Sequence, residues 1–185
     1  DLLNWMVSLS NWGRWGDDDQ RGMLNLQTSE SILKALKLVK QGKTYNLSVP
    51  LEADGPQHPM FHKTWQTTFM TTHAEPCAFQ VADDVLTMVT HSGTHMDALG
   101  HCWTDGLLWN GQSTDKVTSY GIEWAGIEQV GQFITRGVML DIAKYKGVDN
   151  LGLGEVITAE DMEACARAQG VKIQPGDVLL LRTGW

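Results

Sequence analysis

Three histidines and one aspartate occur within eleven residues of this chain, in the run His91-Ser-Gly-Thr-His95-Met-Asp97-Ala-Leu-Gly-His101. A catalytic site for zinc or a similar ion needs about three His, Asp or Glu ligands and an open position for water. His91, His95 and Asp97 can supply these ligands, which leaves His101 for another role. Imidazole and carboxylate together suit zinc or manganese, and the run contains no thiolate of the kind that closes a structural zinc site. The run therefore predicts a catalytic site for a divalent metal, Zn or Mn.

The backbone of this run cannot be a straight strand. At roughly 3.3 Å per residue, a strand would hold His91 and Asp97 about 20 Å apart, which no single ion spans. The chain must therefore curl after the apolar run 85–89, and Gly93 permits an unusual backbone angle at that point. One helical turn would bring His91 and His95 onto one face. We expect a buried strand that leads into a turn carrying the metal ligands, with His101 on the segment that follows the turn.

The alternative is that these are ordinary histidines, each satisfied by backbone hydrogen bonds near a strand end. A lone histidine favours that interpretation, because motif matches carry false positives. Four such groups at this density favour a metal or catalytic site instead.

The run resembles the signature of the cyclase family, H-x-G-T-H-x-D-x-x-x-H, whose members include bacterial kynurenine formamidases and isatin hydrolases. The resemblance covers nearly the whole chain, and its flanking parts suggest the larger-chain branch of the family. These flanking parts are Trp15-Gly16 with Asp19, Gly22 and Asn25, then Asp105-Gly106, Trp109-Asn110-Gly111, and residues 136–141 and 176–185.

The resemblance implies roles for the four residues of the run. In this family the first two histidines and the aspartate bind Zn or Mn, and the third histidine acts in proton transfer. Those roles fall on His91, His95 and Asp97 as metal ligands and on His101 as the catalytic residue. The resemblance also implies a swivelling β/β/α domain, a mixed sheet with flanking helices, and a homodimer or higher homo-oligomer.

Both ends of the chain differ from what the family leads us to expect. Members usually continue well past the Arg-Thr-Gly-Trp segment to a further His and a Glu near the active site, whereas this chain stops at Trp185. It also begins at Asp1 without an initiator methionine. We therefore expect one cyclase-family domain over residues 1–185 that is incomplete at its C-terminus.

Composition narrows the class of protein and of partner. A chain of 185 residues with 42% hydrophobic content can bury a sizeable core in one domain. A net charge of −8 and a pI near 5.1 argue against nucleic acid and anionic membrane as partners and favour a small-molecule substrate. Cys77, Cys102 and Cys165 are widely spaced and lack a CxxC pair, which indicates neither a disulfide framework nor a cysteine zinc site. Since no signal peptide or apolar membrane span is evident either, we expect a cytoplasmic protein.

The first half of the chain predicts one helix and one strand. Apolar residues at helical spacing predict a helix that Thr28 or Ser29 caps and Gly42 ends. Alternation over residues 45–49 predicts a half-buried strand, which Pro50 stops.

The second half predicts an α/β arrangement. Residues 133–142 and 177–181 are typical of strands, and the continuous apolar character of the second predicts burial on both faces. Between them, Thr158 and Asp161 resemble a capping box at the start of a helix that Gly170 ends.

Four residues are candidate substrate contacts: Thr94, Trp65, His62 and Trp103. Thr94 lies between two predicted ligands and could hold a ligand or an oxyanion, but a threonine in a turn can equally bond the backbone. Trp65 and His62 lie in the irregular stretch 52–72, which is typical of a functional loop. Trp65 and Trp103 could line an aromatic pocket, or could be core or interface residues.

The metal-binding run predicts a metal-dependent hydrolase, and the family resemblance implies that it cleaves a carbon–nitrogen bond, other than a peptide bond, in an aryl formamide or cyclic amide. The metal would lower the pKa of a bound water from near 15.7 toward about 7, and His101 would pass a proton to the leaving nitrogen. A lactone hydrolase or dehydrating cyclase on the same metal site is the first alternative. A non-catalytic metal-binding module or inactive fragment is the second.

Overall fold

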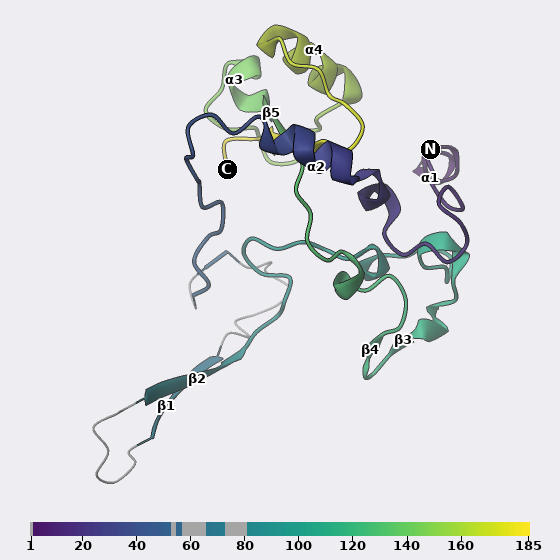
Figure 1. The fold of residues 1–185 in the computed structure, drawn as a ribbon, viewed down its shortest axis with the longest axis vertical. Coiled ribbons are helices and arrows are strands. Elements are labelled where there is room, and N and C mark those ends of the chain that lie inside the picture. Colours follow the sequence, from purple (N-terminus) through teal and green to yellow (C-terminus); the bar gives the residue numbers. More distant parts are fainter. Residues whose placement is uncertain (1, 53–54, 57–65, 73–80) are drawn as a thin grey trace. The chain divides into compact units, whose positions relative to one another are not determined.

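The computed structural model describes residues 2–52, 55–56, 66–72 and 81–185. The chain forms two compact units, one made of residues 1–42 with 98–185 and the other of residues 43–97. Figure 1 shows the helices and strands of both units along the chain. One domain over residues 1–185 stays a prediction.

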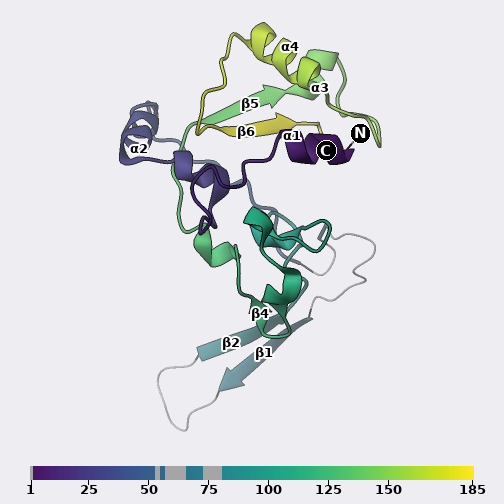
Figure 2. The ribbon, with the colours of Figure 1, turned by 90° about the vertical axis from the view of Figure 1, so that its right-hand side faces the viewer.

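The first unit contains a parallel strand pair with helices packed on it. Strand β5 (Gly137–Asp141) pairs in parallel with β6 (Val178–Arg182), in a register that runs from Gly137 opposite Val178 to Asp141 opposite Arg182. Parallel neighbours need a crossover connection, and here it contains α3 (Ile142–Lys146) and α4 (Ala159–Gln169). Both helices lie on the same side of the pair (Figure 2). Their shared core consists of Val138, Leu140, Ile142, Leu151, Cys165 and Ala166.

Helix α4 begins and ends as its sequence predicts. The Thr158 hydroxyl accepts from the Asp161 backbone N–H at 3.1 Å, and the Asp161 carboxylate accepts from the Thr158 N–H at 3.2 Å. Gly170 ends the helix with a φ of 67°. The predicted capping box is confirmed, and Asp replaces the usual Glu without loss of either hydrogen bond.

The two strands confirm the α/β prediction, but the expected burial of β6 on both faces is wrong. Leu179, Leu180 and Leu181 are 37–40% exposed. Among the described residues β6 pairs only with β5, and α3 and α4 lie on one side of that pair. A continuous apolar run predicts a strand, but the number of layers that cover it depends on other segments.

The rest of the first unit is built from short helices and turns around a smaller core. The elements in chain order are α1 (Leu2–Ser8), a 3₁₀ helix (Gly22–Leu26), α2 (Ser29–Leu36), 3₁₀ helices Leu99–His101, Trp109–Gly111 and Thr114–Lys116, the antiparallel pair β3 (Val117–Thr118) and β4 (Gly121–Ile122), and a 3₁₀ helix (Ile127–Gln129). Leu108, Trp124 and Ala125 form the core, and Trp109 and Ile122 pack against it.

Helix α2 is shorter than predicted. Thr28 caps it as expected, through a bond from the Ser31 N–H to the Thr28 hydroxyl at 3.1 Å. The helix ends at Leu36 rather than near Gly42. Leu33, Leu36 and Val39 are 49–64% exposed, so the apolar stripe has little packing to extend the helix.

The second unit contains one hairpin. Strand β1 (Gln66–Thr72) pairs antiparallel with β2 (Val81–Thr87), with Gln66 opposite Thr87. The strand expected before the metal-binding run is therefore present, but its burial was wrongly predicted, since Val85 and Leu86 are 49% and 44% exposed. The strand predicted over residues 45–49 is also wrong, because that segment joins no ladder and Leu47 is 72% exposed.

The described residues form three two-stranded sheets, two antiparallel and one parallel, rather than one mixed sheet. The mixed α/β class is as predicted. No helix in the described ranges is long and apolar enough to cross a membrane.

Candidate metal centre

The metal-binding run begins four residues after β2 ends and curls as the sequence requires. Residues 90–94 form bends, residues 95–98 are irregular, and a 3₁₀ helix covers Leu99–His101. Gly93 has a φ of +62°, which confirms the predicted unusual backbone angle. A side chain at Gly93 would also lie 3.2 Å from Val49 Cγ2. The single helical turn considered for His91 and His95 does not form, because the bends bring these residues together instead.

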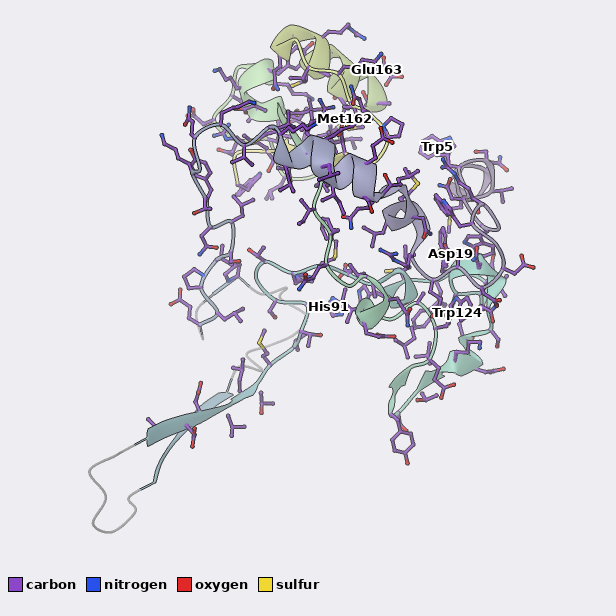
Figure 3. The ribbon with its side chains drawn as sticks, viewed as in Figure 1. Trp5, Asp19, His91, Trp124, Met162 and Glu163 are labelled. Carbon is purple, nitrogen blue, oxygen red and sulfur yellow. The ribbon has the colours of Figure 1, made fainter. Side chains whose placement is uncertain are left out.

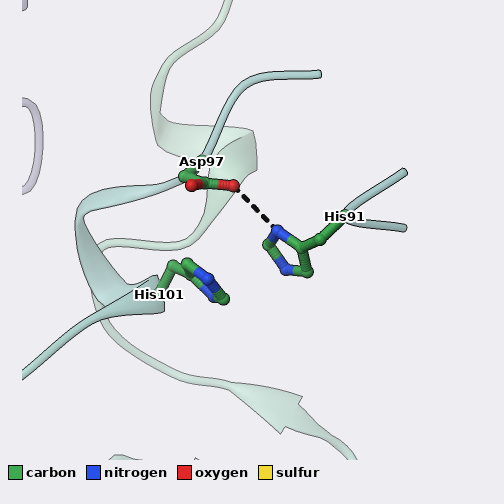
Figure 4. Close-up of side chains that lie close together, drawn as sticks. All are labelled: His91, Asp97 and His101. Atoms are coloured by element: carbon green, nitrogen blue, oxygen red, sulfur yellow. Dashed lines mark hydrogen bonds and ion pairs between the residues drawn. The ribbon is translucent and has the colours of Figure 1, made fainter. Parts of the chain in front are cut away.

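The Asp97 carboxylate lies between two imidazoles. Its Oδ1 is 2.8 Å from His91 Nδ1 and 3.2 Å from His95 Nε2. The two rings pack edge to face, with centroids 5.2 Å apart. Figure 4 shows the hydrogen bond between His91 and Asp97. The structure thus brings together the three residues predicted as metal ligands.

The tautomer of His95 leaves one nitrogen for a metal. Its Nδ1 is 3.1 Å from the Gly93 carbonyl oxygen, which can only accept, so Nδ1 carries the proton in this hydrogen bond. In the neutral imidazole, the form that binds a metal, Nε2 is then the unprotonated nitrogen, and it faces Asp97. A histidine ligand commonly donates its other N–H to a carbonyl oxygen in this way.

His101 lies close to the same carboxylate. One ligand atom from each of His91, Asp97 and His101 can be chosen so that all three lie within 4.8 Å of one another (Figure 4). His101 is exposed and closes the 3₁₀ helix Leu99–His101, four residues after Asp97. His95 and His101 are therefore two candidates for the third ligand beside His91 and Asp97.

The donor set fits a divalent ion. Two ligand atoms at tetrahedral positions about 2.1 Å from a zinc ion lie roughly 3.4 Å apart. The 2.8 and 3.2 Å separations at Asp97 Oδ1 are close to this value, and the nitrogen and oxygen donors suit zinc or manganese. The Asp97 side chain is 50% exposed, which leaves room for water at the site.

Thr94 uses its hydroxyl to hold the turn. Its Oγ1 accepts from the Val49 N–H at 3.1 Å and donates to the Leu47 carbonyl at 3.2 Å. These bonds tie the turn to residues 47 and 49, which belong to no sheet. A contact between Thr94 and substrate stays a prediction.

Asp19 organises the N-terminal loop through its hydrogen bonds. Its carboxylate accepts from the backbone N–H groups of Arg21 and Gly22 and from the side chains of Asn25 and Trp109. Burial raises the pKa of Asp19, but these hydrogen bonds outweigh burial and leave its pKa below the ordinary value. Asp19 and the buried Trp124 are labelled in Figure 3. Trp124 donates to the Trp109 carbonyl at 2.8 Å, so it is a core residue.

The first unit also contains an apolar cavity of about 230 Å³. Three tryptophans line it, and so do Leu99 and Cys102, which lie on either side of His101 in the chain. The lining residues are Met6, Trp12, Leu99, Cys102, Trp103, Thr104, Leu107, Leu108 and Trp109. Trp103 thus lines an aromatic cavity, and its contact with substrate stays a prediction. The other two candidate substrate residues, Trp65 and His62, lie outside the described residues.

A family model for cyclases matches residues 45–185, which is most of the chain and includes the whole metal-binding run. The chain belongs to the cyclase family. A crystal structure of a protein described as a novel cyclase is 38% identical to this cyclase chain and superposes with a TM-score of 0.88. The match covers 95% of this chain and 63% of that one, so this cyclase spans less than two thirds of its relative's length. The search of curated proteins found no match.

Sequence reasoning missed several residues that shape this cyclase's site. Residues 47–49 bind the Thr94 hydroxyl, and Gly100 donates a backbone hydrogen bond to Ala125. Both contacts fix the backbone near the histidines. Neither Gly100 nor residues 47–49 carry a chemical group that draws attention in a sequence. Gly100 had one local signal, because a glycine next to a predicted catalytic histidine can mark close backbone packing.

Proposed function

We propose that this cyclase-family chain is part of a metal-dependent hydrolase that cleaves a carbon–nitrogen bond in an aryl formamide or cyclic amide. The observation that carries the proposal is the Asp97 carboxylate, held within 2.8 and 3.2 Å of two imidazole nitrogens. Family membership supports an enzyme at this site.

Three residues would bind the metal and a fourth would transfer the proton. A bound Zn or Mn ion would polarise the substrate carbonyl and lower the pKa of a water toward about 7. His91, His95 and Asp97 would hold that ion. His101 would take a proton from the attacking water and deliver it to the leaving nitrogen, since it is exposed and lies near the proposed ligands.

The choice of His95 over His101 as third ligand rests on hydrogen bonding. The Gly93 carbonyl would accept from His95 Nδ1, while Nε2 lies 3.2 Å from the Asp97 carboxylate. His101 is thereby left for proton transfer, the role that the family resemblance implies. Substituting each histidine and measuring metal content separates the two roles.

The cavity lined by Leu99 and Cys102, two residues that flank His101 in the sequence, supports an aromatic substrate. A cavity of about 150 Å³ holds a benzene ring, so 230 Å³ accommodates an aryl group. Among the described residues that line it, none carries a charged side chain, which favours a neutral ring. We assign Trp103 to this contact, together with Trp65, His62 and Thr94 as further candidates.

Other aspects of the proposal follow the family and the composition. We propose the swivelling β/β/α fold, a small-molecule substrate, a homodimer or larger assembly, and a cytoplasmic location. A lactone hydrolase or dehydrating cyclase is the second candidate, because the same hydroxide could attack a lactone and the family is described by cyclisation.

The test uses the full-length protein, loaded with Zn or Mn. Metal content is measured beside turnover of aryl formamides such as N-formylkynurenine, cyclic amides such as isatin, and matched lactones. We expect stoichiometric metal and amide hydrolysis that a His95→Ala variant abolishes together with metal binding. Faster turnover of the lactones would favour the second candidate, and absence of bound metal would refute the site.

A further inference from the structure

Gly100, the residue before His101, packs closely against residues 124–125 of the first unit. It is buried, and its N–H donates to the Ala125 carbonyl at 2.9 Å. A side chain at Gly100 would lie 2.7 Å from the Trp124 carbonyl oxygen and 3.0 Å from that of Ala125. The position of the His101 backbone is therefore set by residues 124–125.

Ala125 has an uncommon backbone conformation. Its φ is +53°, in the left-handed region that favours glycine, and the residue is 1% exposed. Such a conformation persists only where the surroundings enforce it, and it is often found near functional sites. The Ala125 N–H donates to the Gln20 side-chain oxygen at 2.8 Å, across 105 residues of chain. Gln20 and Gly100 thus bind the two polar groups of the same strained residue.

Gln20 is itself held in place by its neighbours. The adjacent Asp19 accepts from Gly22 at 2.9 Å and from the Trp109 ring N–H at 3.1 Å. Leu99 packs closely on Gly22, where an added Cβ would lie 3.0 Å from Leu99 Cδ1. The loop that carries Gln20 therefore also touches the first residue of the 3₁₀ helix that ends at His101.

We infer that Gln20 is a positioning residue for His101, acting through Ala125 and Gly100. The Gln20 oxygen fixes the Ala125 peptide, and the Ala125 carbonyl fixes the Gly100 N–H. Together these bonds orient the turn that presents the His101 imidazole. This inference rests on the proposed function, which gives His101 the proton-transfer step.

A matched control exists in the same unit. The Gln27 side-chain oxygen accepts from the Ile134 N–H at 2.6 Å, across 107 residues. It makes the same kind of bond as Gln20, but to Ile134 rather than to Ala125, the residue that accepts from the Gly100 N–H. If Gln20 only stabilises the fold, the two glutamines should behave alike.

The experiment compares Gln20→Ala, Gln20→Glu, Gln27→Ala and His101→Ala in the full-length, metal-loaded protein. The readouts are kcat, KM, bound metal, thermal midpoint, and hydrogen exchange at the Gly100 amide. We expect Gln20→Ala to lower kcat by about ten- to a hundredfold with KM and metal content unchanged, as loss of a supporting contact does. Exchange at Gly100 should accelerate at least about tenfold, because the acceptor at Ala125 is no longer held.

The two other glutamine variants separate positioning from stability. Gln20→Glu keeps an acceptor oxygen and should retain most of kcat. Gln27→Ala should lower the thermal midpoint about as much as Gln20→Ala but leave kcat and Gly100 exchange unchanged. If Gln20→Ala does not fold, Gln20→Asn, whose amide is one carbon too short to reach Ala125, takes its place.

Unchanged kcat and unchanged Gly100 exchange in Gln20→Ala would overturn the inference, and so would an equal loss of kcat in Gln27→Ala. Full activity of His101→Ala would instead refute the proposed function. In that case Gly100 exchange in the Gln20 variants still decides whether Gln20 holds this turn.

Discussion

In the first unit, the β5–β6 pair and the segment that ends in His101 are held by different means. The strand pair uses a backbone ladder, a capped helix and a core of six buried residues. The turn that carries His101 uses bonds from Gly100 to Ala125 and from Ala125 to Gln20, far away in the chain. Regular structure tolerates many single changes, whereas a turn held by single hydrogen bonds depends on each of them. The site-bearing region should therefore respond more sharply to small substitutions.

The largest effect is expected at Asp97, whose Oδ1 contacts both His91 and His95. Asp97→Ala should abolish metal binding and lower activity by about 1,000-fold or more, since the ion supplies several kcal/mol of transition-state stabilisation. Metal content and turnover of the full-length protein check this. Asp84→Ala, an exposed acid on β2, is the control and should retain both. Metal retained by Asp97→Ala would show that the ligands lie elsewhere.

The next prediction compares the loss of stability when a glycine is replaced by alanine in each of the two regions. Gly100→Ala should lower the free energy of unfolding by about 1–3 kcal/mol, because the new methyl group collides with the carbonyl oxygens of residues 124 and 125. Gly137→Ala, at the start of β5, meets only Leu180 Cδ1 at 3.6 Å and should change stability by less than about 0.5 kcal/mol. Denaturant titration measures both. Equal effects would mean that Gly100 is not tightly packed.

A smaller, pH-dependent effect is expected at the ion pair beside the strands. Hydrogen bonds from Arg136 hold the pKa of Asp177 below its ordinary value of 3.8. A carboxylate with a lowered pKa in the folded state stabilises the protein above its unfolded pKa, and this contribution is lost as pH falls through the folded pKa. Stability should therefore decline below about pH 4, and Asp177→Asn should show a flatter decline over the same range. Thermal midpoints at several pH values test this, and parallel curves would contradict it.

The smallest effect is expected at the helix cap. Thr158→Ala removes the hydroxyl that accepts from Asp161 and should cost about 1 kcal/mol of stability. Activity should not change, because α4 belongs to the region held by regular structure. Thr158→Ser, which keeps the hydroxyl, should restore most of the loss. A fall in kcat for Thr158→Ala would show that the two regions are coupled.

Local patterns in the sequence were sufficient for some of these features and insufficient for others. The capping box at Thr158 and the turn at Gly93 depend on neighbouring residues, so both could be predicted. The bonds between residues 47–49 and the Thr94 hydroxyl could not, because Thr94 lies 45 residues beyond Val49. The exposed leucines of β6 also escaped prediction, since burial depends on which other segments cover a strand.

The candidate site divides in the same way. The density of His91, His95 and Asp97 marked the site without any structure, and the fold brought these side chains together. Gln20 and Ala125 gave no signal, because a glutamine and an alanine become informative only when their hydrogen bonds and backbone angles are known. Residues with catalytic or metal-binding groups can be recognised in a sequence, but most residues that position those groups cannot.

The N-terminal loop is held by hydrogen bonds to residues about 100 positions later in the chain, and this separation affects when the loop can fold during synthesis. The partners of Gly13, Gln20 and Gln27 follow them by 97, 105 and 107 residues. At about 5–20 residues per second, the N-terminal arm waits roughly 5–20 s on the ribosome before those partners are synthesised. The arm cannot settle in its final place during this interval, and contacts of such separation also form slowly in the released chain. The contacts that hold the N-terminal loop should therefore form only after residues 110–134 have been synthesised, and more slowly than the local hydrogen bonds within α4.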